Sequence, residues 1–121
     1  MAGWTVAYKN AVQDSGSPAT IYISLYVGDP TTTGGTELSA TGYARQSCSL
    51  GASATGTTSN TAAVVFSATG TNLGTPTYAG WHSAATGGTV YGGDALATGG
   101  RAMVTGATLT FTTGAIDLTI T

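Results

Sequence analysis

The chain has 121 residues, a net charge of −2 and only 7% charged residues, where an ordinary domain has about 25%. Three Lys and Arg side chains in all are too few to displace the counterions of a phosphate backbone, so we expect no nucleic-acid partner. The surface must consist largely of Thr, Ser, Gly and small apolar groups, which resist association poorly, and we predict a protein that works packed against others.

Cysteine content and hydropathy bear on the compartment. Cys48 is the single cysteine and cannot form an internal disulfide, so we expect a buried free thiol and folding in a reducing cytoplasm. No apolar run approaches ~18 residues and no signal peptide is recognisable, so we expect no membrane partner. A chain of this length can bury enough surface to fold as one domain without a metal or a disulfide.

The N-terminal segment has the one helix-like pattern in the sequence. In residues 4–13, WTVAYKNAVQ, the aromatic side chains of Trp4 and Tyr8 fall on one helix face, and a cluster of Ser, Gly and Pro follows. We therefore predict a short helix or an irregular arm over residues 1–18, followed by a single β-domain over residues 19–121.

The first predicted strand, residues 19–27 (ATIYISLYV), alternates with period two. Its apolar face would hold Ile21, Ile23, Leu25 and Val27, and its other face Tyr22, Ser24 and Tyr26. Pro30 has no N–H to donate, so the strand must end before it. Asp29 is expected to form an Asx turn, in which its carboxylate accepts backbone N–H groups.

The rest of the chain predicts short strands separated by Gly-rich turns. The segments are 42–50, 58–67, 76–84, 89–97, 101–104, 107–113 and 115–121. Such spacing indicates an all-β fold, namely an antiparallel β-sandwich of jelly-roll or immunoglobulin-like type, with a closed barrel as the alternative.

No motif for chemistry is recognisable. His82 is the single histidine and lacks companions for a zinc site, and there is no GxSxG elbow for a nucleophilic serine. Glu37 and Asp117 are expected to be exposed. We therefore predict no catalytic residue, no metal site, no cofactor and no enzyme activity.

The order of motifs resembles a family of small virion proteins of tailed bacteriophages. Residues 20–121 carry the resemblance, through the segments YISLYVGDP, GYARQ, SNTAAVVFS and GGTVYGGDAL. GYARQ (42–46) with GGTVYGGDAL (87–96) is the specific part. Thr89-Val90-Tyr91 stands where a Leu-rich strand is more usual. Members are labelled head decoration, minor structural or tail-fibre protein, so the resemblance implies a virion β-domain made in the host cytoplasm, and it implies no catalytic residue.

Arg45 is one of three cationic residues and lies near Tyr43. We expect its guanidinium to lie on an aromatic ring while it donates to carbonyls or to one carboxylate. This use would hold a strand or a subunit contact in place, with ligand recognition as the alternative.

Two functions compete at this point. The favoured one is a capsid decoration protein that binds the major capsid protein and stabilises the assembled head, as a trimer or a similar small symmetric cluster. Trp4 and Tyr8 are interface candidates on the arm, together with Tyr43 and Arg45, although Trp4 could equally plug one end of the sandwich. The alternative is a tail-fibre or tail-tip module that binds a host-surface glycan through aromatic side chains, drawn from Tyr22, Tyr26, Tyr43, Tyr78, Tyr91 and Trp81.

Overall fold

The computed structural model describes Thr5, Ala7 and residues 20–32, 34–52, 57–96 and 100–119, with the backbone alone for 117–119. Trp4, Tyr8 and almost all of the predicted arm over residues 1–18 lie outside the described residues. Within the described part, no helix is both long and apolar enough to cross a membrane.

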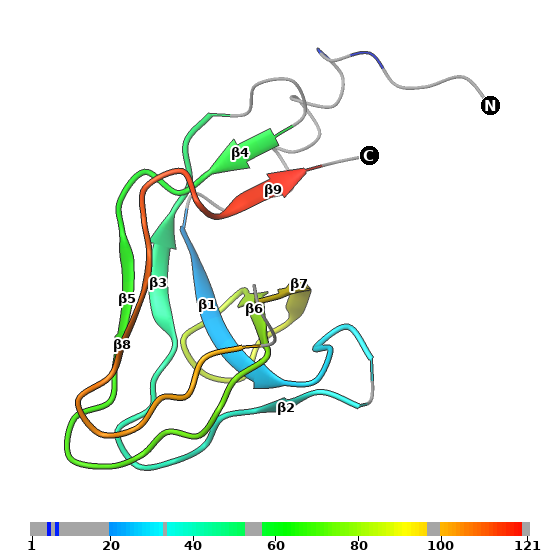
Figure 1. The fold of residues 1–121 in the computed structure, drawn as a ribbon. Coiled ribbons are helices and arrows are strands. Elements are labelled where there is room, and N and C mark those ends of the chain that lie inside the picture. The colour runs from blue at the N-terminus through cyan, green and yellow to red at the C-terminus, as the bar shows by residue number, and fades with distance from the viewer. Residues whose placement is uncertain are drawn as a thin grey trace.

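The described elements are strands, and every pair of them is antiparallel (Figure 1). They are β1 Thr20–Val27, β2 Thr36–Glu37, β3 Gln46–Ser49, β4 Thr57–Ser59, β5 Val64–Ser67, β6 Tyr78–His82, β7 Val90–Ala95, β8 Thr108–Phe111 and β9 Asp117–Thr119. The predicted all-β sandwich is therefore confirmed.

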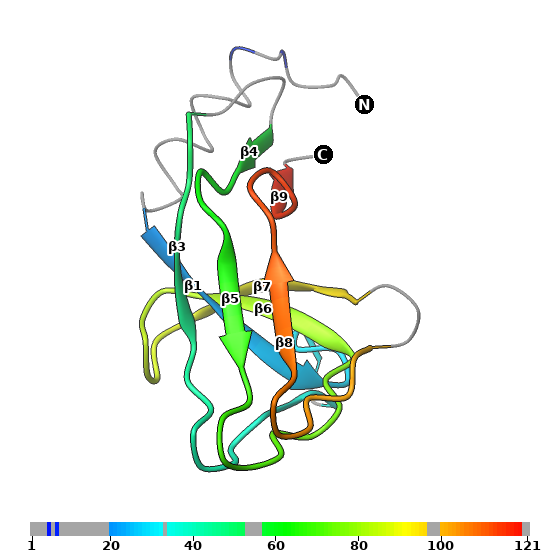
Figure 2. The same ribbon diagram turned by 60° about the vertical axis from the view of Figure 1, so that its left-hand side comes forward.

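A five-stranded sheet forms one layer. Its order is β2-β1-β6-β7, and β3 joins the same edge of β1 as β2, one at each end of β1. The pair β5–β8 packs against this sheet, and the pair β4–β9 lies at one end of the molecule (Figure 1). Figure 2 shows β3, β5 and β8 side by side in front of β6 and β7, which cross behind them.

The hydrophobic core lies between these layers. Ile21, Ile23 and Leu25 of β1 are each at most 1% exposed, as the alternation predicted. They pack with Cys48, Val64, Phe66, Ala68, Leu73, Met103 and Ile116. The expected buried free thiol of Cys48 is confirmed. Val27 was predicted to share this face, but it is 48% exposed at the end of β1, one residue beyond the last pair with β6.

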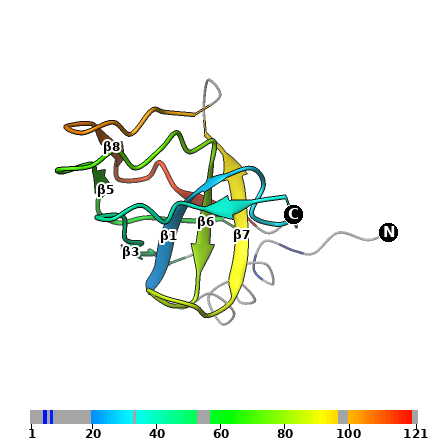
Figure 3. The same cartoon turned by 90° about the horizontal axis from the view of Figure 1, so that it is seen from below.

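The opposite face of the five-stranded sheet is also covered. Ser24 and His82 are 0% and 1% exposed, and Tyr26 is buried beside them. Pro30 lies over this face so closely that a Cβ on Gly93 would overlap its ring. The turn that brings Pro30 here is the predicted Asx turn, in which Thr31 N donates to Asp29 Oδ1 over 2.8 Å. Figure 3, from below, shows the segment between β1 and β2 curving back past the sheet.

Several predicted strands are shorter than expected. The segment 42–50 forms a strand only from Gln46 to Ser49. The segment 58–67 divides at Asn60, whose amide donates to the carbonyls of Ala62 and Thr112 and so replaces ladder bonds. The segment 101–104 is reduced to a single bridge between Met103 and Gly74.

Candidate functional site

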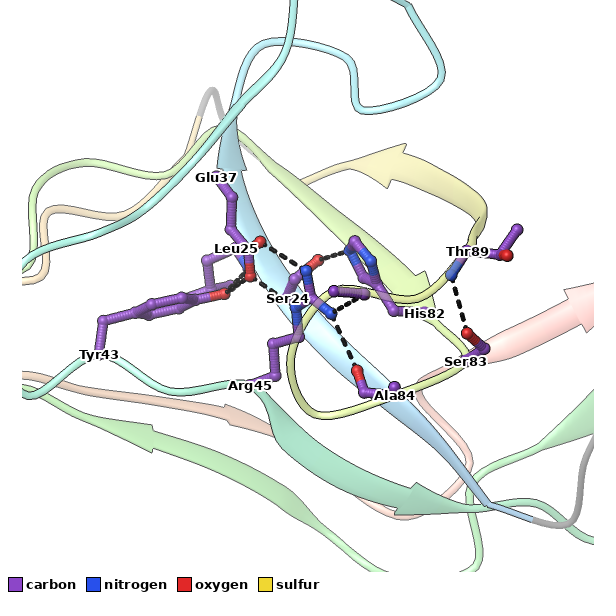
Figure 4. A network of polar contacts seen from close by, with 10 residues as sticks. Ser24, Leu25, Glu37, Tyr43, Arg45, His82, Ser83, Ala84 and Thr89 are labelled. Atoms are coloured by element: carbon purple, nitrogen blue, oxygen red, sulfur yellow. Dashed lines mark hydrogen bonds and ion pairs between the residues drawn. The ribbon is translucent and has the colours of Figure 1, made fainter.

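A polar cluster lies where the chain leaves the five-stranded sheet between β2 and β3 (Figure 4). Both backbone groups of Leu25 face this gap in the edge of β1. Leu25 O accepts from Leu38 N over 3.0 Å, and Leu25 N donates to the hydroxyl of Tyr43 over 3.0 Å. A side chain therefore takes the place of a missing strand, since buried backbone groups must find partners.

Arg45 is the centre of this cluster. Its Nε and Nη2 donate to the two carboxylate oxygens of Glu37, each over 2.8 Å, in a bidentate pair. Its Nη1 donates to the carbonyls of Ala84 and Gly87 over 2.9 and 2.8 Å. Arg45 thereby connects β2 to the hairpin between β6 and β7. The side chains of Arg45 and Glu37 are 10% and 23% exposed, so the pair is largely shielded from water.

Glu37 is a correction to the sequence analysis, which placed it on the exposed surface. Besides Arg45 it accepts a hydrogen bond of 2.7 Å from the hydroxyl of Tyr43. Burial alone would raise the pKa of Glu37, but the hydrogen bonds from Arg45 and Tyr43 and the charge of Arg45 outweigh it and lower that pKa. The carboxylate stays ionised where it is needed to hold Arg45.

Tyr43 joins the polar cluster to the core. Burial, and next its hydrogen bond to Glu37, raise the pKa of Tyr43, so its hydroxyl stays protonated and acts as a donor. Its ring stacks on Phe66 with a centroid distance of 6.4 Å and an interplanar angle of 4°. Phe66 in turn meets Phe111 edge-on at 6.3 Å. One side chain thus contacts the apolar core through its ring and the ion pair through its hydroxyl.

His82 lies beneath the cluster on the same face of the sheet. Its Nε2 is 2.7 Å from Ser24 Oγ, and its ring stacks on Tyr26 at 5.8 Å. Its Nδ1 is buried and has no hydrogen-bond partner among the described residues. Burial, and next the charge of Arg45, lower the pKa of His82, while Glu37 has a smaller opposing effect. The imidazole is therefore neutral near pH 7.

The chemistry open to this cluster is limited by its burial. Ser24 and His82 have the spacing of a nucleophile and a base, but both are almost fully enclosed, so a substrate could not reach Ser24 Oγ in this structure. Across the described ranges, no three His, Cys, Asp or Glu side chains lie close enough together to hold a metal ion. The arrangement is suited to holding loops together.

The structure brings two of the four predicted interface residues together. Tyr43 and Arg45 both donate hydrogen bonds to Glu37. Arg45 also donates to two carbonyls, so the hydrogen bonds expected of it, to carbonyls or a carboxylate, are present. The predicted stacking of the guanidinium on a ring is absent among the described residues, where the ring contacts join Tyr43 to Phe66, Phe66 to Phe111 and Tyr26 to His82. Sequence reasoning missed Glu37, although its signal was available, because a shielded Arg needs a carboxylate and the chain has just five.

Residues 8–119 of the chain match the model of a protein family described as Podophage GP4 fiber I protein gp80. The matched range contains every strand from β1 to β9. No curated protein matches the chain. The match supports the resemblance to phage virion proteins, while the value of GYARQ as a specific marker stays a prediction.

Proposed function

Because the chain belongs to the family of the podophage GP4 fiber I protein gp80, it is a structural component of a phage virion, and we propose that its place is in a tail fibre. The observation that carries this proposal is the family match, which extends over residues 8–119 and so concerns the whole β-domain. In this role the protein is a non-enzymatic module that contacts the host surface, and its partners are copies of itself and a host-surface glycan.

The architecture supports a module of this kind. Fibre modules bear load and bind weakly at many identical sites, so that affinity accumulates through the number of copies. The hairpin between β6 and β7 is fixed to the sheet by Arg45 through Ala84 O and Gly87 O, which keeps an exposed loop in one conformation. A fixed loop loses little conformational entropy when it meets a partner.

Capsid decoration, the function favoured by the sequence, is the second candidate. It is supported by β3, β5 and β8, which lie side by side (Figure 2) and whose exposed residues have hydroxyl or small apolar side chains and no charge. These residues are Ser47, Ser49, Val65, Ser67, Thr108 and Thr110. An uncharged face of this kind suits a broad contact with a shell or with a neighbouring subunit, and its partner would be the major capsid protein.

Immunogold labelling of purified virions of the source phage separates the two candidates. Gold at the tail, with few to some tens of copies per particle, is the expected result. Gold spread over the head, with hundreds of copies, would replace the fibre proposal with capsid decoration. Virions that carry no gold and none of this protein by mass spectrometry would contradict both.

A further inference from the structure

A hollow lies at the open side of the sandwich, between β6 and β7 on one side and the segment from β8 to Ile116 on the other. Figure 2 shows β8 passing in front of β6 and β7 at this place. Its lining is apolar apart from one carboxylate. It consists of Ile23, Ala79, Trp81, Asp94, Ala95, Leu96, Phe111, Ala115 and Ile116.

The indole of Trp81 lines this hollow and lies against the neighbouring strand β7. The residue opposite Trp81 in the ladder is Gly92. A Cβ on Gly92 would lie 2.8, 2.9 and 3.0 Å from Cζ2, Cε2 and Nε1 of the indole, so one face of the ring covers this glycine. Gly92 therefore permits an aromatic platform at the wall of the hollow, where any larger residue would tilt the ring.

Asp94 supplies the polar group of the hollow. It lies on β7, two residues after Gly92 and thus on the same face, and it is exposed. Asp94 Oδ1 accepts from Ala95 N over 2.8 Å, which fixes the carboxylate, and its other oxygen has no partner among the described residues. A carboxylate acceptor, an indole and an apolar floor thus line one hollow.

We propose that this hollow binds one sugar ring of a host-surface glycan, and that the ring is neutral or carries an amino group. The inference rests on the proposed function, because it names the ligand class that the module contacts. A pyranose presents C–H groups on one face, which pack on an indole, and hydroxyls on its rim, which donate to a carboxylate. Asp94 repels the carboxylate of an acidic sugar and attracts an amino sugar, which sets the selectivity.

The test observes the indole of Trp81 directly. In a ¹⁵N-labelled Trp4→Phe variant, the single indole N–H signal belongs to Trp81, since the chain has two Trp residues. Methyl glycosides of glucose, galactose, mannose and rhamnose, then glucosamine and glucuronic acid, are titrated separately. At least one neutral or amino sugar is expected to shift this signal with a dissociation constant on the order of 1 mM, the scale for a ring of about a dozen heavy atoms. Glucuronic acid is expected to bind at least about tenfold more weakly.

Three variants locate the site. Ala115→Leu adds bulk to an exposed residue of the lining and is expected to abolish the shift, with the fold checked by the remaining amide signals. Asp94→Asn keeps the shape of the side chain and is expected to remove the discrimination against glucuronic acid. Tyr91→Ala is the matched control, an exposed aromatic of the same strand that does not line the hollow, and it is expected to leave binding unchanged.

The outcomes are distinct from those of the immunogold experiment. No shift with any neutral or amino sugar up to about 50 mM, or binding that survives Ala115→Leu, would overturn the sugar site even if gold labels the tail. Equal binding of glucuronic acid would overturn the role of Asp94 in selectivity. Gold on the head together with a saturable shift would leave the sugar site standing and remove the fibre proposal.

Discussion

The two faces of the five-stranded sheet are covered by different physical means. On the face toward β5–β8, aliphatic and aromatic side chains exclude water around Ile23 and Phe66, and no member of this core cluster is charged. On the other face, His82 and Ser24 are enclosed beneath an ion pair between Arg45 and Glu37. The stability of the first face depends on close packing of apolar side chains, whereas that of the second depends on which groups are ionised. We therefore expect the two faces to lose stability under different conditions.

The largest expected loss of stability follows from a substitution on the apolar face. Phe66→Ala removes a ring that is 2% exposed and that meets both Tyr43 and Phe111. We expect it to lower the free energy of unfolding by about 3–5 kcal/mol, measured by chemical denaturation. The loss should be the same near pH 7 and near pH 5, since no titrating group is removed. A loss that depends strongly on pH would contradict the separation of the two faces.

Arg45→Ala is expected to have the next largest effect, about 2–3 kcal/mol, because it leaves Glu37 and two carbonyls without their donor in a shielded place. Arg45→Lys is the matched control. It keeps the charge but cannot bind both carboxylate oxygens and two carbonyls at once, so about half of the loss should remain. If Arg45→Ala left both the melting temperature and virion incorporation unchanged, Arg45 would have no role in holding the loops.

The pH dependence should come from the polar face. The folded-state pKa of His82 is lowered below its ordinary 6.5, so its contribution to stability is present above pH 6.5 and is lost as the pH falls. Glu37 acts in the same direction at lower pH, because its pKa is lowered below 4.5 and its contribution is lost as the pH falls further. We expect the melting temperature to fall in two stages on acidification. His82→Asn should remove the first stage and leave the second, and a wild-type melting temperature that is constant down to about pH 4 would show that folding does not lower the pKa of His82.

Tyr43→Phe should give the smallest of these effects, about 1–2 kcal/mol. The ring keeps its stacking on Phe66, and the variant loses the bond to Glu37 and the acceptor for Leu25 N. Amide hydrogen exchange at Leu25 measures the second loss and should become faster than in the wild type. Exchange that stays slow would mean that another group satisfies Leu25 N.

The sequence was sufficient for the apolar face and insufficient for the polar one. Alternation along 19–27 predicted the burial of Ile21 and Leu25, because side chains two apart on a strand share a face. The ion pair joins Glu37 on a two-residue strand to Arg45 in the loop before β3, and neither segment has a period that could reveal it. The hollow beside Trp81 depends on strand register, since Gly92 lies under the indole only in the pairing that the fold adopts.

The way in which Arg45 holds the β6–β7 hairpin has a consequence for evolvability. Arg45 binds main-chain oxygens, and the base of the hairpin is closed by Ser83 and Thr89. The glycines at 87 and 88 have positive φ angles and must stay, but the exposed side chains of Ala85 and Thr86 take no part in holding the loop. This pair of positions can vary while the loop keeps its shape, which gives the phage a place to change its surface, and a designer a place to graft short sequences, at little cost in stability.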